Sequence, residues 1–311
     1  MKNLLLLLAL VSTIWSCKSD EAKNESAPPA LLSNTLFFQS EEAIPVTLKT
    51  DFSRLLSEDT DDDYQQAWLS VPAKDGTIIT EAIKVRKRGV TRKKICDFPP
   101  LKLKFNDPQS SLNLKLVTHC QQDEEMQKLI LKEYLVYKMY NELTDYSFRV
   151  QLIKVIYEDL AEELPKMEKY AFVIENAEQM ANRLEASVLE TPIQVKYLEK
   201  DQCRLFTGFQ YLIGNTDWNL GKRHNLKMLT PDGDGNPLPV PYDFDYCGLV
   251  DAPYAIPHPS LPIQSVRERH FMWRGKDRKG FETVLQTLQE KKRSLLEVCE
   301  NFPYLNSDDR Q

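Results

Sequence analysis

The sequence has few of the residues that usually build metal or thiol sites. Its four histidines form no metal-binding pattern, and no C-x-x-C pair indicates zinc binding or redox chemistry. It also lacks internal repeats, long low-complexity segments and a basic tail. The net charge is -6, which argues against general binding to nucleic acid or anionic lipid, because such binding needs an excess of positive charge.

What the amino terminus does contain is typical of export. A basic start at Met1–Asn3 precedes an apolar run from Leu4 to Val11, which is too short to be a comfortable membrane span. Cys17 follows a small residue, as in a bacterial lipoprotein cleavage site, so we expect residues 1–17 to be a signal peptide with a lipid on Cys17. An ordinary signal peptide or a weak anchor is the alternative. The charged segment Lys18–Glu21 resembles the signal that sends lipoproteins to the cell surface in the Bacteroidetes lineage.

The rest of the chain divides into a linker and one large domain. Residues 18–35 lack apolar periodicity and are expected to form a flexible tether. Residues 36–311 are enough for a single or two-lobed domain with a full core. If Cys17 carries lipid, five cysteines remain, and an odd number leaves at least one free thiol.

Apolar periodicity in this domain changes along the chain. Alternation with a period of two predicts a small antiparallel sheet from segments at 44–48, 78–85, 101–105 and 112–117. Residues 124–143 switch to helical spacing. Later segments predict strands at 150–157 and 170–174, a helix from Gln202, a hairpin around 232–236 and a closing helix at 280–299. A proline-rich irregular segment follows Asp251.

Acidic and amide side chains gather in the second half of the domain. Asp217 follows the apolar helix in a polar loop, Asn225 opens a strand, and Asp243 and Asp245 follow the next strand. Phosphoryl transfer needs this set, because one carboxylate can accept the proton of an attacking hydroxyl while an amide oxygen and a carboxylate hold divalent metal. The alternative is two ordinary turns, since Asp and Asn favour turns. The order of the residues along the chain favours the first interpretation.

Basic residues crowd the segment from Lys84 to Lys94, around Arg88 and Gly89. A charged edge strand is the usual reason for such a run, because charge protects a sheet edge from aggregation. A glycine allows close approach of the backbone to a ligand, and guanidinium groups bind phosphate oxygens in a forked geometry. We therefore favour phosphate contact by Arg88 and Gly89.

These two blocks together resemble the CotH family of atypical protein kinases. The matching features are Asp217 in its loop, Asn225 opening a strand, the Tyr242–Asp245 motif, and a segment similar to the family's Arg-Gly-x-Ser/Thr-Arg signature that here reads Arg88-Gly-Val-Thr-Arg92. The resemblance covers about residues 44–251. It implies an α+β, two-lobed protein-kinase-like fold, with an antiparallel sheet and one helix in the N-lobe and a largely helical C-lobe carrying a catalytic hairpin.

The resemblance also implies a role for each residue. Asp217 would be the catalytic base, Asn225, Asp243 and Asp245 would bind Mg²⁺ or Mn²⁺, and Arg88 and Gly89 would contact ATP. Because Asp217 and Asn225 are eight residues apart, more than is usual, Asn219 is an alternative metal ligand. Lys115 or Lys104 would hold the nucleotide phosphates and pair with Glu133. Glu175 would lie at the hinge where adenine binds.

The function implied is a surface or periplasmic lipoprotein kinase that transfers the γ-phosphoryl group of ATP to a Ser/Thr hydroxyl of a protein. A weaker form of this hypothesis has a glycan as the acceptor. The alternative from another class is an inactive kinase-like binding or adhesion module, since a fold alone does not establish activity. ATP is scarce outside the cytoplasm, which favours the alternative, so nucleotide binding is the property that separates the two.

Overall fold

A computed structural model of the chain describes residues 37–57, 63–73, 75–106, 113–233, 235–273 and 279–310. Cys17 and the predicted tether at 18–35 lie outside these residues, so the lipid anchor stays a prediction. Among the described segments, no helix has both the length and the apolar composition needed to cross a membrane.

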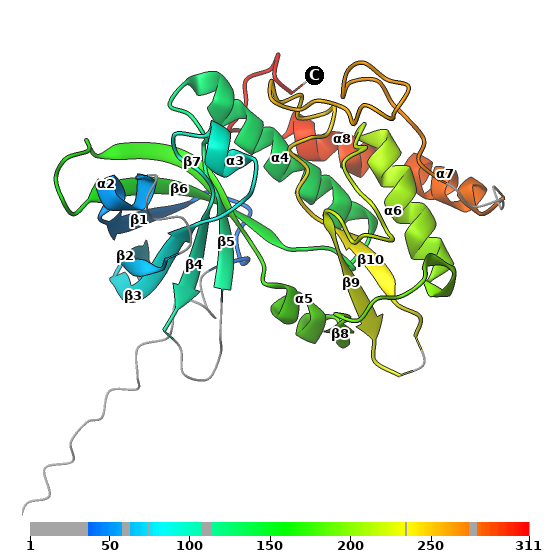
Figure 1. The fold of residues 1–311 in the computed structure, drawn as a ribbon, viewed down its shortest axis with the longest axis horizontal. Helices are drawn as coiled ribbons and strands as arrows, with labels where there is room; N and C mark the ends of the chain where they lie inside the picture. Colours follow the sequence, from blue (N-terminus) through cyan, green and yellow to red (C-terminus); the bar gives the residue numbers. More distant parts are fainter. Residues whose placement is uncertain are drawn as a thin grey trace, which may run out of the picture. The chain divides into compact units, whose positions relative to one another are not determined.

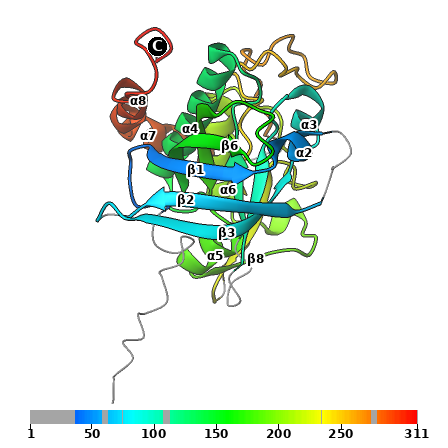
Figure 2. The same ribbon diagram turned by 90° about the vertical axis from the view of Figure 1, so that its left-hand side faces the viewer.

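The first part of the described chain forms a closed barrel of seven strands (Figures 1 and 2). Their order around the barrel is β1-β2-β3-β4-β5-β7-β6. Neighbouring strands pair antiparallel except β1 and β6, whose parallel pairing runs from Ile44↔Ile153 to Thr50↔Asp159 and closes the barrel. The strands are β1 (Ile44–Thr50), β2 (Gln65–Pro72), β3 (Ile78–Lys87), β4 (Leu101–Phe105), β5 (Asn113–Val117), β6 (Val150–Asp159) and β7 (Met167–Ile174).

Alternating side chains explain why these segments form a barrel. Every second residue faces inward and is buried, so the interior fills with aliphatic and aromatic groups, among them Leu48, Leu69, Val85, Leu103, Leu116 and Val155. Two short helices interrupt the strand order: α2 (Phe52–Leu56) follows β1, and α3 (Arg92–Ile95) lies between β3 and β4. A disulfide joins Cys96, directly after α3, to Cys120, just beyond β5. Cys203, Cys247 and Cys299 are free thiols.

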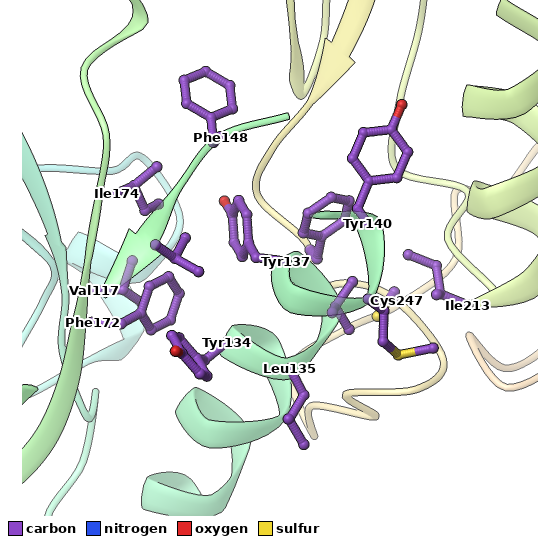
Figure 3. Close-up of a cluster of buried hydrophobic side chains, with 14 of the residues drawn as sticks. Val117, Tyr134, Leu135, Tyr137, Tyr140, Phe148, Phe172, Ile174, Ile213 and Cys247 are labelled. Carbon is purple, nitrogen blue, oxygen red and sulfur yellow. The ribbon is translucent and has the colours of Figure 1, made fainter. Parts of the chain in front are cut away.

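Helix α4 (Glu124–Leu143) confirms the predicted helix at 124–143. It begins at Asp123, whose carboxylate accepts a hydrogen bond from the backbone N–H of Met126 at 2.8 Å. Three tyrosines of α4 lie in the apolar cluster between the barrel and the C-terminal segments (Figure 3). The ring of Tyr137 meets Phe172 of β7 edge-on at 5.6 Å and Phe244 at 4.7 Å. Aromatic packing therefore connects the barrel to the segment around residues 243–245.

The C-terminal part combines helices, a small sheet and irregular segments. Strands β8 (Ala186–Val188), β9 (Leu226–Pro231) and β10 (Leu238–Pro241) form a sheet in the order β10-β9-β8. The antiparallel pair β9–β10 confirms the predicted hairpin. The helices are α5 (Ala177–Arg183), the 3-10 helix η1 (Val195–Tyr197), α6 (Lys200–Leu212), α7 (Gly280–Glu290) and α8 (Lys292–Glu300).

The predicted fold class, a two-lobed kinase-like α+β fold, was wrong. The segments expected to form an antiparallel N-lobe sheet close into a mixed barrel, because β1 pairs in parallel with β6. Period-two alternation is the same in an open sheet and in a barrel, so it could not reveal this closure. The part expected to be largely helical contains a three-stranded sheet and a long irregular stretch at 242–273, where prolines interrupt the chain.

Candidate functional site

A compact loop after α6 holds Asp217. Gly214 ends the helical segment with a positive φ of 70°, and the side-chain oxygen of Asn215 accepts a hydrogen bond from the backbone N–H of Asp217 at 2.9 Å. Asn219 and His224 then exchange backbone hydrogen bonds of 3.2 and 3.0 Å, which close residues 219–224 into a tight turn. This turn brings Asn225 back to Asp217 although eight residues separate them.

The Asp217 carboxylate is held at both oxygens. Nδ2 of Asn225 donates to Oδ2 at 2.9 Å and to the Asp217 carbonyl at 2.8 Å, and Nε2 of His224 lies 2.9 Å from Oδ1. The Asp217 side chain is still 39% exposed, so an incoming hydroxyl group can reach it. No role was expected for His224, because a single histidine in a loop is usually exposed to solvent without a functional partner.

The structure places Asn225, and not Asn219, against Asp217. The side-chain oxygen of Asn219 accepts from the backbone N–H of Lys222 at 2.8 Å and so caps the turn. Asn225 directs its NH₂ group to Asp217, and its amide oxygen accepts no hydrogen bond from the described residues. Its backbone oxygen accepts from Tyr242 N–H at 3.1 Å, which links this loop to the segment carrying Asp243.

Asp243 follows β10 and has a left-handed backbone conformation, with φ of 66°. Its N–H donates to the hydroxyl of Tyr137 at 2.8 Å, while its carboxylate accepts no hydrogen bond from the described part of the chain. Asn225 is also left-handed, with φ of 54°. Non-glycine residues in this region are uncommon and often mark functional sites.

Asp245, unlike Asp243, forms an ion pair within the protein. Strand β10 ends at Pro241, so Asp243 and Asp245 both follow it, as expected from the sequence. Asp245 accepts from Nε of Arg92 at 2.9 Å, and Arg92 also donates through Nη2 to Glu133 of α4 at 2.8 Å. The predicted pairing of Glu133 with Lys115 or Lys104 is therefore replaced by an ion pair with Arg92.

This ion-pair cluster is buried, with side-chain exposures of 9% for Arg92, 1% for Glu133 and 8% for Asp245. Burial raises the pKa of Glu133 to about 7 and, although Arg92 opposes the shift, also raises the pKa of Asp245. Burial disfavours the charged form of Arg92, but the two carboxylates outweigh it and raise the pKa of Arg92 well above its ordinary value. Tyr254 lies beside this cluster: burial raises the pKa of its hydroxyl, and the charges of Arg92, Asp245 and Glu133 act on it.

A second group of cations lies on the outer face of the barrel. Lys115 of β5 is half-buried, and its ammonium lies 3.9 Å from the centre of the Tyr242 ring. Burial lowers the pKa of Lys115 to about 7; the cations Arg88, Lys227 and Lys102 lower it further, and Asp243 opposes them. Lys102 is the direct cross-strand partner of Lys115. Lys115 therefore lies among positive charges with one acidic neighbour, Asp243.

The remaining predicted cofactor residues are spread over the structure. The guanidinium of Arg88 makes no hydrogen bond within the described segments, and Gly89 is exposed with φ of 93°. Lys104 is exposed, with its ammonium 5.8 Å from the Tyr64 ring. The Glu175 carboxylate is fully buried and is neutralised by Arg149 and Arg183 at 2.7 and 3.0 Å. The predicted adenine contact therefore does not involve an available Glu175 carboxylate.

The oxygen donors near Asp243 suit a small, hard cation, because Mg²⁺ and Mn²⁺ prefer carboxylate and carbonyl oxygens. They comprise the free carboxylate of Asp243 and the amide oxygen of Asn225. In the described part of the chain, no group of three or more His, Cys, Asp or Glu is arranged to hold a metal ion. Any divalent metal here would depend on the asparagine oxygen and on the bound ligand to complete its coordination.

No protein-family model matches the sequence, and no curated protein matches it. The structure is similar to the crystal structure of a Helicobacter pylori proinflammatory kinase, CtkA, over 68% of this chain and 86% of that chain. The sequence identity is 10% and the TM-score is 0.36. A similarity this low carries no conclusion about the fold or activity of this chain, and the resemblance to the CotH family stays a prediction.

Proposed function

We propose that this protein binds ATP with Mg²⁺ or Mn²⁺ and transfers the γ-phosphoryl group to a Ser/Thr hydroxyl of a protein. The observation that carries the proposal is the group of cations around Lys115, on which Asp243 acts as an acidic neighbour. The carboxylate of Asp243 accepts no hydrogen bond from the described residues. Asp217 and Asn225 lie in a loop that is hydrogen-bonded to the same segment through Tyr242 N–H. Phosphate-binding cations, a metal-binding carboxylate and a base are thus contributed by neighbouring segments.

The cations support the proposal of phosphate binding because they repel one another when no anionic ligand is bound. Lys102 lies directly opposite Lys115 on one neighbouring strand and opposite Arg86 on the other. Like charges directly opposite in a sheet destabilise it, and burial makes the charge on Lys115 less favourable still. An anionic ligand with several oxygens would remove both penalties. The triphosphate of ATP has the charge and the number of acceptors required.

Asp217 is suited to act as the base. Nδ2 of Asn225 and Nε2 of His224 orient its carboxylate, and its exposure lets a hydroxyl approach. In the proposed reaction, the acceptor oxygen forms a bond to the γ-phosphorus as the bond from phosphorus to the β–γ bridging oxygen breaks. The hydroxyl proton passes to Asp217 and ADP leaves. A divalent cation held by Asn225 and Asp243 would neutralise phosphate charge during this step.

The disulfide supports the proposal that the protein works outside the cytoplasm. Cys96–Cys120 is a structural disulfide, and such bonds persist mainly in oxidising compartments. We further propose that lipid on Cys17 anchors the protein to the outer membrane or the cell surface. Cys17→Ser should release the protein from the membrane fraction, and membrane association unchanged by Cys17→Ser would refute the anchor.

Transfer from radiolabelled ATP to a Ser/Thr-rich protein, with Mg²⁺ or Mn²⁺, tests the activity. We expect metal-dependent transfer by the wild type and its loss in Lys115→Met. Lys154→Met is the matched control, because Lys154 also lies on a barrel strand but pairs with Glu168 at the surface. ATP binding without transfer to any acceptor would refute the proposed transfer reaction and leave only the nucleotide site. Absence of both would refute the proposed function.

A further inference from the structure

Arg92 is the cation that connects three separate segments of the chain. It lies on α3, Glu133 lies on α4, and Asp245 follows β10, so its two partners are 41 and 153 residues away in the sequence. The guanidinium uses different nitrogens for the two contacts, Nη2 for Glu133 and Nε for Asp245. Arg92 thereby holds the barrel, α4 and the Asp245 segment in one arrangement.

The position of Asp245 fixes the neighbouring Asp243. Only Phe244 separates them, and this residue is fully buried against Tyr137. Tyr137 also accepts the N–H of Asp243 through its hydroxyl, at 2.8 Å. The backbone at Asp243 is therefore held twice: by the ion pair of Arg92 with Asp245 and by the hydrogen bond to Tyr137. Its carboxylate accepts no hydrogen bond from the residues that the structure describes, while its backbone is held by Tyr137.

A lysine could not replace Arg92 in this role. A guanidinium is planar and presents a fixed fork of donors, whereas an ammonium is a compact charge on a flexible stem. Lys115 is not available to substitute, because its ammonium lies over the Tyr242 ring and not near Glu133. These contacts give the two cations different roles. Arg92 binds the buried carboxylates, whereas Lys115 can bind the ligand.

Resting on the proposed function, we infer that Arg92 is a positioning residue of the phosphotransfer site. Arg92 would not contact the reacting atoms itself. Its guanidinium holds Asp245 so that the Asp243 carboxylate presents its oxygens to metal and phosphate. Loss of this geometry should therefore weaken the binding of the metal ion more than the binding of the nucleotide by Lys115 and Arg88.

The test is Arg92→Lys, compared with Arg293→Lys on the exposed face of α8, where the side chain is 71% exposed. Transfer rates are measured as a function of Mn²⁺ and of ATP concentration, together with melting curves. For Arg92→Lys we expect kcat to fall about tenfold or more and the Mn²⁺ concentration for half-maximal activity to rise severalfold. The KM for ATP at saturating Mn²⁺ should change less than threefold, and Arg293→Lys should match the wild type.

A purely structural role would lower the melting temperature of Arg92→Lys without changing the Mn²⁺ dependence of the folded protein. That result would overturn the inference and leave the proposed function intact. A wild type that neither binds ATP nor transfers phosphate would overturn both. If Arg92→Lys does not fold, Tyr254→Phe removes one hydroxyl that lies beside the same cluster. It should raise the Mn²⁺ requirement in the same direction by a smaller factor, and an unchanged requirement would refute the inference.

Discussion

The Arg92 cluster and the cations around Lys115 differ in how their charges are neutralised. Arg92, Glu133 and Asp245 are buried, and their charges are paired with one another. The cations around Lys115 are half-exposed, and Arg88 makes no ion pair within the described residues. A cluster that is neutralised internally stabilises an arrangement. A cluster with excess charge is suited to an external ligand, so the comparison separates positioning residues from binding residues.

The largest expected effect concerns Asp217, the proposed base. Asp217→Asn should lower phosphoryl transfer by a factor on the order of 10²–10⁴, which is the usual contribution of a general base. Its folding should change little, because the amide oxygen can accept from Nδ2 of Asn225 while the amide NH₂ donates to an unprotonated Nε2 of His224. Radiolabel transfer and melting curves measure the two properties. A variant with the full rate would exclude Asp217 as the base.

The free energies of unfolding of Arg92→Met and Lys115→Met test the difference between the two clusters. Arg92→Met leaves two buried carboxylates without a cation and should lower the free energy of unfolding by about 3–5 kcal/mol. Lys115→Met removes a poorly solvated charge among other cations and should leave the free energy unchanged or raise it. Urea unfolding of both variants without nucleotide measures this difference. Equal destabilisation would show that Lys115 is as structural as Arg92.

Loss of the disulfide should have the next largest effect on stability. The bond holds Cys96, which directly follows α3, the helix that carries Arg92. Closing the loop between Cys96 and Cys120, 24 residues apart, stabilises a protein by about 3 kcal/mol in the chain-entropy model. The double variant Cys96→Ser/Cys120→Ser should lose about this much in urea unfolding. Its Mn²⁺ requirement should also rise, as for Arg92→Lys. A variant with wild-type stability would show that the bond is dispensable.

Several elements could be predicted from the sequence because their signals are local. Helical spacing predicted α4, and the Gly- and Asp-rich turn between two apolar segments predicted the β9–β10 hairpin. The resemblance assigned Asp217 and Asn225 to one site but left Asn219 as the alternative to Asn225, because the tight turn at 219–224 could not be predicted.

Long-range contacts account for what the sequence did not reveal. The parallel pairing of β1 with β6 joins residues more than a hundred positions apart and leaves no trace in local periodicity. Arg92 belongs to a run of basic residues, most of which are partly or fully exposed, so composition could not single it out as buried. Glu133 and Asp245 are its partners only because α4 and the segment after β10 pack together. The assignment of Glu133 to a lysine failed for this reason.

A further expected effect is a dependence of Lys115 and of ATP binding on pH. The pKa of Lys115 is lowered to about 7 in the folded protein, whereas an unfolded lysine titrates near 10.4. Between these values the unfolded state binds more protons, so this residue makes stability rise with pH from about 7 to 10. Affinity for ATP should instead fall as pH rises from 6 to 8, because the ammonium loses its proton. Lys115→Met should remove both trends, and trends that persist in this variant would assign them to another group.

Calorimetric titration of the purified protein with ATP and Mn²⁺ tests the central claim most directly, with Lys115→Met and Lys154→Met as the compared variants. We predict metal-dependent binding by the wild type and by Lys154→Met. Lys115→Met should bind more weakly by about 1.5–3 kcal/mol, the contribution of a hydrogen bond to a charged group. No heat of binding at millimolar ATP, or equal affinity in all three proteins, would contradict the proposal that this cluster binds nucleotide phosphates.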